Sequence, residues 1–481
     1  MSFEISEKVD APNIFLAKFS ELSGQRFDPG IVLFTRKVHR FNYPVHKFQK
    51  YFRESPQYGA GERGIPRESN EQTRYVRITD IDENGILSNE LGATAENLED
   101  RYLLEDGDLL LARSGNTVGK AYLHRSAKTP YACIFAGYLI RVRLASEEMR
   151  PEYAFALTQL PYYKEWVKAV QRVAGQPNIN ADEYSDLEIP VPPLEIQQQI
   201  VDLLQTAHHE KQQRETEARK MLDSIDAVLL AELGITPQPE PPNEIENRIF
   251  ITKFSETTGQ RWDSIYHQSD IFHFIRKSKY ELCKLNELAS YFLTGFAAGR
   301  GDQAEEENGI IQIRPTNLSE ERELVFHRNV YIHKDELEKR PSDVLKRGEV
   351  LFNNTNSQEQ VGKTVLFDLP GEYFSSNHIT RIATDKERLH PQFLCYLLNL
   401  YQRRQAFFKL CTNWNNQSGV GSDILARLPI PLPNIETQTE IVTKLNDICE
   451  QANNLREEAA AQLETAKREI EAMILGETTN S

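Results

Sequence analysis

The side chains that stand out in this sequence are hydrogen-bond donors and acceptors that could read nucleic-acid bases. In duplex DNA, arginine and lysine pair with guanine, asparagine and glutamine pair with adenine, and basic or small polar groups contact phosphates. Such residues gather in loop-like stretches in both halves of the chain, although any one of them could be an ordinary solvated group. The candidates in the first half are Arg63, Arg67, Arg74, Arg77, Arg113, Ser114, Asn116, Lys120, Gln176 and Asn178. Those in the second half are Arg300, Arg314, Asn353, Asn354, Asn356, Lys363, Asn416 and Gln417.

Motifs of enzymes that act on nucleic acids are missing. The sequence has no Asn/Asp-Pro-Pro-aromatic motif of an amino-methyltransferase and no Asp-x-Lys or Glu-x-Lys pair of a common nuclease site. It also lacks the zinc-protease and serine-hydrolase motifs. Gly362-Lys363-Thr364 resembles the end of a phosphate-binding loop, but Ser357 stands where that loop needs a glycine. We therefore expect no enzymatic activity, no catalytic residue, no metal and no cofactor in this chain.

Length, charge and cysteine content limit the partners and the compartment. The chain has 481 residues, which predicts two or three domains. Its net charge of -15 argues against a protein that coats nucleic acid, so any DNA contact must be local. The 5 cysteines form no C-x-x-C pair, which favours reduced thiols. Because no stretch of about 18 apolar residues occurs, we expect a cytoplasmic protein without a membrane segment.

An internal repeat is the strongest pattern. Segment 19–28, FSELSGQRFD, returns at 254–263 as FSETTGQRWD. Further matched pairs, in the same order, are 107–111 with 348–352, 118–120 with 361–363, and 190–201 with 431–442. The halves diverge between these anchors, which predicts one duplicated scaffold with two specificities, although drift after an old duplication would leave the same trace. Arg113 and Asn353 each follow a probable strand at one repeat position, so we hypothesise that both lie near DNA.

Each repeat is expected to be mixed α/β. Short apolar runs bounded by Gly, Asp or Asn predict strands. These runs are 108–112, 138–144, 349–352 and 379–383. Segments 151–170 and 391–410 have apolar residues at helical spacing behind an initial proline, which favours helices. The proline-rich steps near 190 and 431 cannot continue a helix and predict extended connectors.

A long helix follows each connector. Apolar residues recur there at gaps of three and four, and a helix of this length is too long to bury against one small domain, so the two should pack as a coiled coil. One such stripe alone could also be an ordinary core helix. The seam residues are Ile200, Leu204, Ala207, Met221, Ile225, Val228, Ile441, Leu445, Ile448, Leu455, Leu463 and Ile470. Lys211 and Arg214 interrupt the first stripe and could set register or face solvent or a partner.

These connectors carry a family resemblance. Extended prolines followed by Leu-Glu-x-Gln or Ile-Glu-x-Gln and a long helix closely resemble the conserved regions of type I restriction–modification specificity subunits, over nearly the whole chain. Segment 175–180, GQPNIN, followed by 187–190 looks like that family's link from recognition domain to helix. The second copy departs from this pattern, with NNQSGV at 415–420.

The resemblance implies a pseudo-twofold internal repeat with two target recognition domains, each reading half of a bipartite DNA site. It further implies an antiparallel pair of helices that holds the domains apart, docks methyltransferase (M) subunits and is joined by restriction/translocase (R) subunits. S-adenosylmethionine and ATP are then expected only in those partners. The expected boundaries are 1–190 and 248–430 for the recognition domains, 191–235 and 431–478 for the helices, and 236–247 for the linker. The alternative is a duplicated coiled-coil protein-interaction scaffold without DNA binding, which the acidic charge favours.

Overall fold

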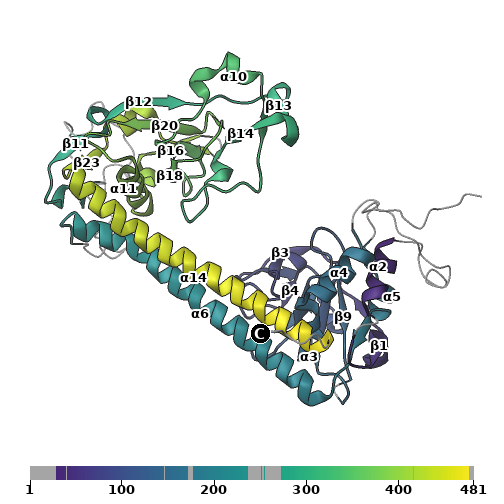
Figure 1. The fold of residues 1–481 in the computed structure, drawn as a ribbon. Coiled ribbons are helices and arrows are strands. Elements are labelled where there is room, and N and C mark those ends of the chain that lie inside the picture. The colour runs from purple at the N-terminus through teal and green to yellow at the C-terminus, as the bar shows by residue number, and fades with distance from the viewer. Residues whose placement is uncertain are drawn as a thin grey trace, which may run out of the picture. The chain divides into compact units, whose positions relative to one another are not determined.

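The computed structural model describes residues 29–38, 41–145, 147–171, 177–236, 251, 254, 272, 274–414 and 417–475. Gln176, Asn416, the first repeated segment and most of the linker lie outside these residues. The chain divides into two compact units, one made of Met1–Glu215 with Leu455–Ser481 and the other of Thr216–Asn454. Each unit therefore holds one globular region and portions of both long helices (Figure 1). The expected domain boundaries stay a prediction.

In the first unit, two four-stranded sheets make the globular region. The main sheet has the antiparallel order β2-β9-β6-β7 and the second sheet has the order β3-β5-β4-β8, in which β4 and β8 are parallel. The strands of the first unit are β1 (Val45–Lys47), β2 (Gln57–Tyr58), β3 (Gly64–Pro66), β4 (Arg74–Val76), β5 (Ala93–Ala95), β6 (Leu109–Ala112), β7 (Ala121–Leu123), β8 (Cys133–Phe135), β9 (Leu139–Val142) and β10 (Glu188–Pro190). The α-helices are α2 (Pro29–Val38), α3 (Pro151–Gln159), α4 (Pro161–Val170) and α5 (Ala181–Ser185), and the 3-10 helices are η1 (Phe48–Tyr51), η2 (Ile78–Asp80) and η3 (Asp100–Tyr102).

The second unit repeats this arrangement with one added small sheet. Its main sheet has the order β12-β20-β16-β18, its second sheet β13-β15-β14-β19 and its added sheet β17-β22-β21. The strands are β11 (Leu282–Lys284), β12 (Ala289–Thr294), β13 (Gln303–Ala304), β14 (Gly309–Ile313), β15 (Tyr331–His333), β16 (Glu349–Asn353), β17 (Thr355–Asn356), β18 (Thr364–Phe367), β19 (Phe374–Ser375), β20 (Ile379–Thr384), β21 (Thr412–Trp414), β22 (Gln417–Gly419) and β23 (Pro429–Pro431). The α-helices are α10 (Glu336–Lys339), α11 (Pro391–Arg403), α12 (Ala406–Leu410) and α13 (Ser422–Ala426). The 3-10 helices are η4 (Ile275–Lys277), η5 (Leu285–Glu287), η6 (Arg300–Asp302), η7 (Glu306–Asn308), η8 (Pro315–Asn317) and η9 (Pro341–Asp343).

The predicted strands at β6, β9, β16 and β20 are confirmed, and so is the mixed α/β class. The predicted helices at 151–170 and 391–410 begin at their prolines, but each is broken into two. Leu160 ends α3 in an extended conformation because Pro161, which follows it, disfavours helical backbone before it. In the second unit Gln405 takes a left-handed φ of 58° between α11 and α12.

The two long helices are α6 (Leu194–Glu232) and α14 (Ile435–Leu475), and their apolar seams pack in both units. In the first unit the early part of α6 meets the late part of α14, because Ile200 and Leu204 share a core cluster with Ile470. In the second unit the late part of α6 meets the early part of α14, through Ile225 and Leu445. The predicted antiparallel pair is therefore confirmed within each unit (Figure 1).

A glycine follows the last turn of α6. Gly234 has a φ of +71°, and the N–H of Ile235 donates to the carbonyl of Leu230 at 2.8 Å, which satisfies a carbonyl left open at the end of the helix. Arg214 is half-buried and its guanidinium lies 3.9 Å from the carboxylate of Glu458 on α14. No helix in the described part of the chain is long and apolar enough to cross a membrane.

Candidate nucleic-acid interface

Three chain segments meet where strand β6 ends. The backbone N–H of Arg113 donates to the carbonyl of Tyr138 at 2.9 Å, and the carbonyl of Arg113 accepts from Ile179 at 2.8 Å. Gly115 adds a bond from its N–H to Pro177 at 3.0 Å. We call residues 113–117, 136–138 and 177–179 the first loop end. Its backbone bonds hold three loops at one edge of the main sheet.

The second unit builds the same junction at the end of β16. Asn354 donates its N–H to the carbonyl of His378 at 3.0 Å and accepts from the N–H of Val420 at 2.9 Å. Residues 354–358, 376–378 and 417–420 form the second loop end. The pairing corrects the hypothesis on repeat positions, because Arg113 corresponds to Asn354. Asn353 instead corresponds to Ala112, since Gly362 and Gly119 donate to their carbonyls in the same way.

The first loop end presents polar and aromatic side chains. The guanidinium carbon of Arg113 lies 4.7 Å from the centre of the Tyr58 ring, and Tyr58 in turn accepts a hydrogen bond from the N–H of Ala181 at 3.1 Å. Tyr138 is 64% exposed, and Asn116 is exposed. Nε of Arg113 and Oδ1 of Asn178 are buried atoms for which the described residues provide no hydrogen-bond partner. Ser114 pairs with Asn178 as an isolated β-bridge.

The second loop end uses its predicted asparagines differently. Asn353 is fully buried and donates from Nδ2 to the carbonyl of Gln360 at 3.1 Å. Asn354 is also buried and donates to the carbonyl of Asn377 and to Oγ1 of Thr380, at 3.2 and 3.0 Å. Both amides brace the junction, so their side chains are not on the surface that DNA would meet.

Amide groups remain accessible elsewhere at the second loop end. Asn356 is partly exposed and accepts the N–H of Ser357 at 2.8 Å through Oδ1. Gln417 and Asn377 are exposed. Asparagine and glutamine are the side chains that pair with adenine. The second loop end therefore presents amide groups, and its turn 354–358 contains no charged residue.

Two predicted arginines lie inside the first globular region. Arg67 donates from its guanidinium to three backbone carbonyls and lies 4.0 Å from the centre of the Tyr131 ring. Arg74 is 1% exposed and donates to the Tyr131 hydroxyl at 3.0 Å. Arg67 follows β3 and Arg74 begins β4, and both side chains pack against Tyr131. This burial means that neither side chain is available to DNA in this conformation.

The remaining predicted arginines are more accessible. Arg63 and Arg300 are exposed. Arg77 pairs with Asp80 at 2.8 Å, which raises the pKa of Arg77. Arg314 is partly exposed, donates from Nε to Gln312 at 3.1 Å, and has a pKa lowered by burial. A DNA contact by any of these side chains stays a prediction.

The two predicted lysines, Lys120 and Lys363, form equivalent ion pairs in the two units. Nζ of Lys120 lies 2.7 Å from the Glu83 carboxylate, and Lys363 pairs with Glu320 at the same place in the repeat. The Lys363 side chain lowers the pKa of Glu320 through a charge-assisted hydrogen bond. Both lysine side chains are largely buried. In the first unit Lys120 ties the turn that follows β6 to loop 81–87. In the second unit Lys363 ties the turn that follows β16 to loop 318–324. Both contacts are made within the chain.

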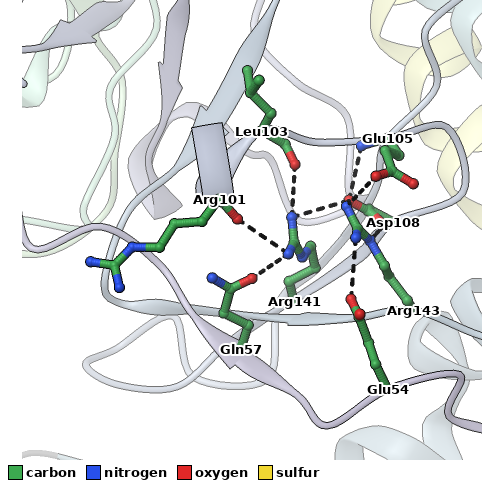
Figure 2. Close-up of polar contacts among 8 residues, drawn as sticks. All are labelled: Glu54, Gln57, Arg101, Leu103, Glu105, Asp108, Arg141 and Arg143. Carbon is green, nitrogen blue, oxygen red and sulfur yellow. Dashed lines mark hydrogen bonds and ion pairs between the residues drawn. The ribbon is translucent and has the colours of Figure 1, made fainter. Parts of the chain in front are cut away.

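An ionic cluster around the buried Asp108 and Arg141, at the start of β6, was not predicted from the sequence. Arg143 lies 2.8 Å from Asp108 and 2.9 Å from Glu105, and Arg141 donates to the carbonyl of Leu103 at 2.7 Å (Figure 2). Burial lowers the pKa of Arg141, whereas the hydrogen bond that Arg143 donates to the Asp108 carboxylate raises the pKa of Arg143. The cluster clamps strand β9 to the segment that follows η3.

In the first unit the Arg141 guanidinium also lies 3.7 Å from the Asp108 carboxylate, and the second unit keeps this ion pair. Arg381 lies 2.7 Å from Glu349 and donates to the carbonyls of Ser342 and Val344 at 2.6 and 2.8 Å. In the pairing of β16 with β20, Leu351 lies opposite Arg381. Leu110 lies opposite Arg141 in the same way in the pairing of β6 with β9. The available signal in the sequence was an arginine at the centre of each apolar strand, because a charge there needs a buried partner.

The glutamine of each connector has a structural role. Gln197 and Gln438 are fully buried at the starts of α6 and α14. Gln197 accepts the N–H of Arg150 at 3.0 Å and donates to the carbonyls of Glu148 and Pro192 at 3.1 and 3.0 Å. Each long helix is thereby bonded to the segment that begins α3 or α11.

No cluster of three or more metal-ligating side chains occurs within the described ranges. All five cysteines lie within those ranges and are free thiols.

Comparison with known proteins identifies the family. The model of the type I restriction modification DNA specificity domain matches residues 65–219 and 277–465. These matches cover most of the chain, so the protein belongs to this family and contains two such domains. It is accordingly a specificity subunit of a type I restriction–modification system.

Individual relatives are distant. The MjaVIII specificity subunit of Methanocaldococcus jannaschii is 22% identical over 408 residues, which cover 84% of each protein. The solved HsdS subunit of Thermoanaerobacter tengcongensis is 17% identical, with 90% of this chain and 95% of that chain covered and a TM-score of 0.36. A chain from a structure of type I R-M complex assembly is 17% identical, with coverage of 90% and 96% and a TM-score of 0.48.

Proposed function

We propose that each loop end reads one block of a bipartite DNA target, so that the chain selects two short sequences at a fixed separation. The observation that carries this proposal is the repeated junction at the ends of β6 and β16. The same backbone bonds position different side chains in the two units, with Arg113 in the first and Asn354 in the second. A constant frame with variable polar groups suits two independent half-site readers.

The proposal includes no chemical step in this chain. The sequence lacks the methyltransferase and nuclease motifs considered above. Methyl transfer and DNA cleavage are therefore assigned to M and R subunits, which bind S-adenosylmethionine and ATP. The continuous helices α6 and α14 are the proposed scaffold for these partners, and the cytoplasm is the proposed compartment because the DNA is there. The family match leaves the interaction-only alternative without support.

Selection from a DNA library tests this function. The full chain with its methyltransferase subunit is incubated with duplexes that hold two random blocks separated by spacers of random length. We expect two short specified blocks at one separation, and methyl transfer only when both subunits are present. Enrichment of a single block, or of none at physiological salt, would contradict the proposal.

A further inference from the structure

Arg113 differs from the buried arginines of its domain in how its guanidinium is used. Arg67 and Arg74 are buried, and Arg77 is paired with Asp80. Arg113 is partly exposed, and the described residues provide no hydrogen-bond partner for its Nε. Its guanidinium carbon lies 4.7 Å from the centre of the Tyr58 ring. Nε is buried, so the donors that this partly exposed side chain offers to a ligand are those of the terminal Nη1 and Nη2.

The base of this side chain is held firmly. The Arg113 backbone is bonded on both sides, to Tyr138 and to Ile179. Tyr58 is fixed by strand β2 and by the bond that its hydroxyl accepts from Ala181. Stacking on this ring limits the rotamers of the guanidinium before any ligand arrives. An arginine ordered in advance loses less conformational entropy when it forms two parallel hydrogen bonds.

The corresponding position in the second unit cannot do the same. Asn354 is buried and its Nδ2 donates to Asn377 and Thr380. The two loop ends therefore differ in the chemistry that this one position offers. A guanidinium fork matches the O6 and N7 acceptors of guanine in the major groove, and no other base presents that pair of acceptors.

We propose that Arg113, stacked on Tyr58, is a specificity-determining residue that reads one guanine in the half-site bound by the first recognition domain. The inference rests on the proposed function of the loop ends. Recognition of one G·C pair in one block depends on this side chain, whereas recognition of the other block does not.

Selection with matched variants of the full chain, again with its methyltransferase subunit, tests the inference. Arg113→Gln should lose the guanine preference at one position of one block and bind the wild-type target about 10-fold or more weakly. Arg113→Lys keeps the charge but lacks the planar fork, so it should restore part of the affinity and discriminate guanine less well. Tyr58→Leu should weaken the same preference through the lost stacking. The control Arg53→Gln removes an equal charge from an exposed position of the same unit that is not among the candidate DNA contacts, and it should leave base preference unchanged.

The outcomes separate the two proposals. If the wild-type complex enriches no sequence, the proposed function fails and the guanine contact fails with it. If it enriches two blocks but Arg113→Gln retains every specified base, only the assignment to Arg113 is overturned. A uniform loss of affinity that lysine fully restores would also overturn it, since this would identify a phosphate contact. Thermal unfolding of each variant checks that its fold is kept.

Discussion

Oε1 of Gln438 accepts a hydrogen bond from the backbone N–H of His390 at 2.8 Å, which joins the start of α14 to the residue that caps α11. The Gln438 amide nitrogen donates to the carbonyls of Arg388 and Pro433, both at 2.8 Å. Gln197 repeats all three bonds in the first unit. The glutamine of the connector thus satisfies three backbone groups where a recognition domain meets its helix.

Replacing Gln438 with leucine should destabilise the second unit. Leucine has similar bulk but leaves one N–H and two carbonyls without their partner, and each buried unsatisfied group costs about 1–3 kcal/mol. We expect a loss of about 2–4 kcal/mol in the free energy of unfolding, measured by urea denaturation. Gln197→Leu should act alike on the first unit. The exposed Gln199→Leu is the control, and equal stability of all three variants would disprove this role.

The pair of Arg381 and Glu349 allows a second test of buried polar structure. Both side chains are almost fully buried, at 1% and 3% exposure. Arg381→Met removes one partner and leaves a buried carboxylate, so we expect a loss of about 3–5 kcal/mol in unfolding free energy. The double variant Arg381→Met with Glu349→Leu should recover much of this loss because no unpaired charge remains. A double variant less stable than the single variant would contradict the argument.

The helices and strands of this protein were predicted from its sequence better than the roles of its polar side chains. The seams of α6 and α14 and the strand at 109–112 are local patterns, and period alone indicates them. The burial of Arg74 depends on Tyr131, and the role of Lys120 depends on Glu83. Those partners come together only when distant strands pair. Residue type and loop context identified Arg113 as a candidate, but its stacking on Tyr58 required the structure.

Arg322 offers a test of backbone strain. It has a left-handed φ of 67°, and Gly85 occupies the matching position of the first unit with a φ of 74°. A side chain at such a φ costs about 1 kcal/mol relative to glycine. Arg322→Gly should therefore be more stable than Arg322→Ala by about 1 kcal/mol, because both variants lose the bond to Gln402 and only glycine relieves the backbone. Thermal unfolding of the two variants measures the difference, and an alanine variant of equal or greater stability would refute the strain.

His208 should make the stability of the first unit depend on pH. Burial, followed by the charges of Lys467 and Lys211, lowers the pKa of His208 from 6.5 to about 4, while Asp82 acts weakly in the opposite direction. Among the described residues its Nε2 has no hydrogen-bond partner, so protonation would leave a buried N–H without an acceptor.

The direction of the pH effect follows from proton binding. Below pH 6.5 the unfolded chain protonates His208 and the folded chain does not, so folding becomes less favourable as the pH falls toward 4. The contribution is fully present above pH 6.5. Because the side chain is partly exposed, we expect a loss on the order of 1–2 kcal/mol between about pH 7 and pH 4. Urea denaturation across this range should show a smaller loss in His208→Gln than in wild type. His209→Gln, on the exposed side of the same helix, is the control. Identical pH slopes in His208→Gln and wild type would show that another group is responsible.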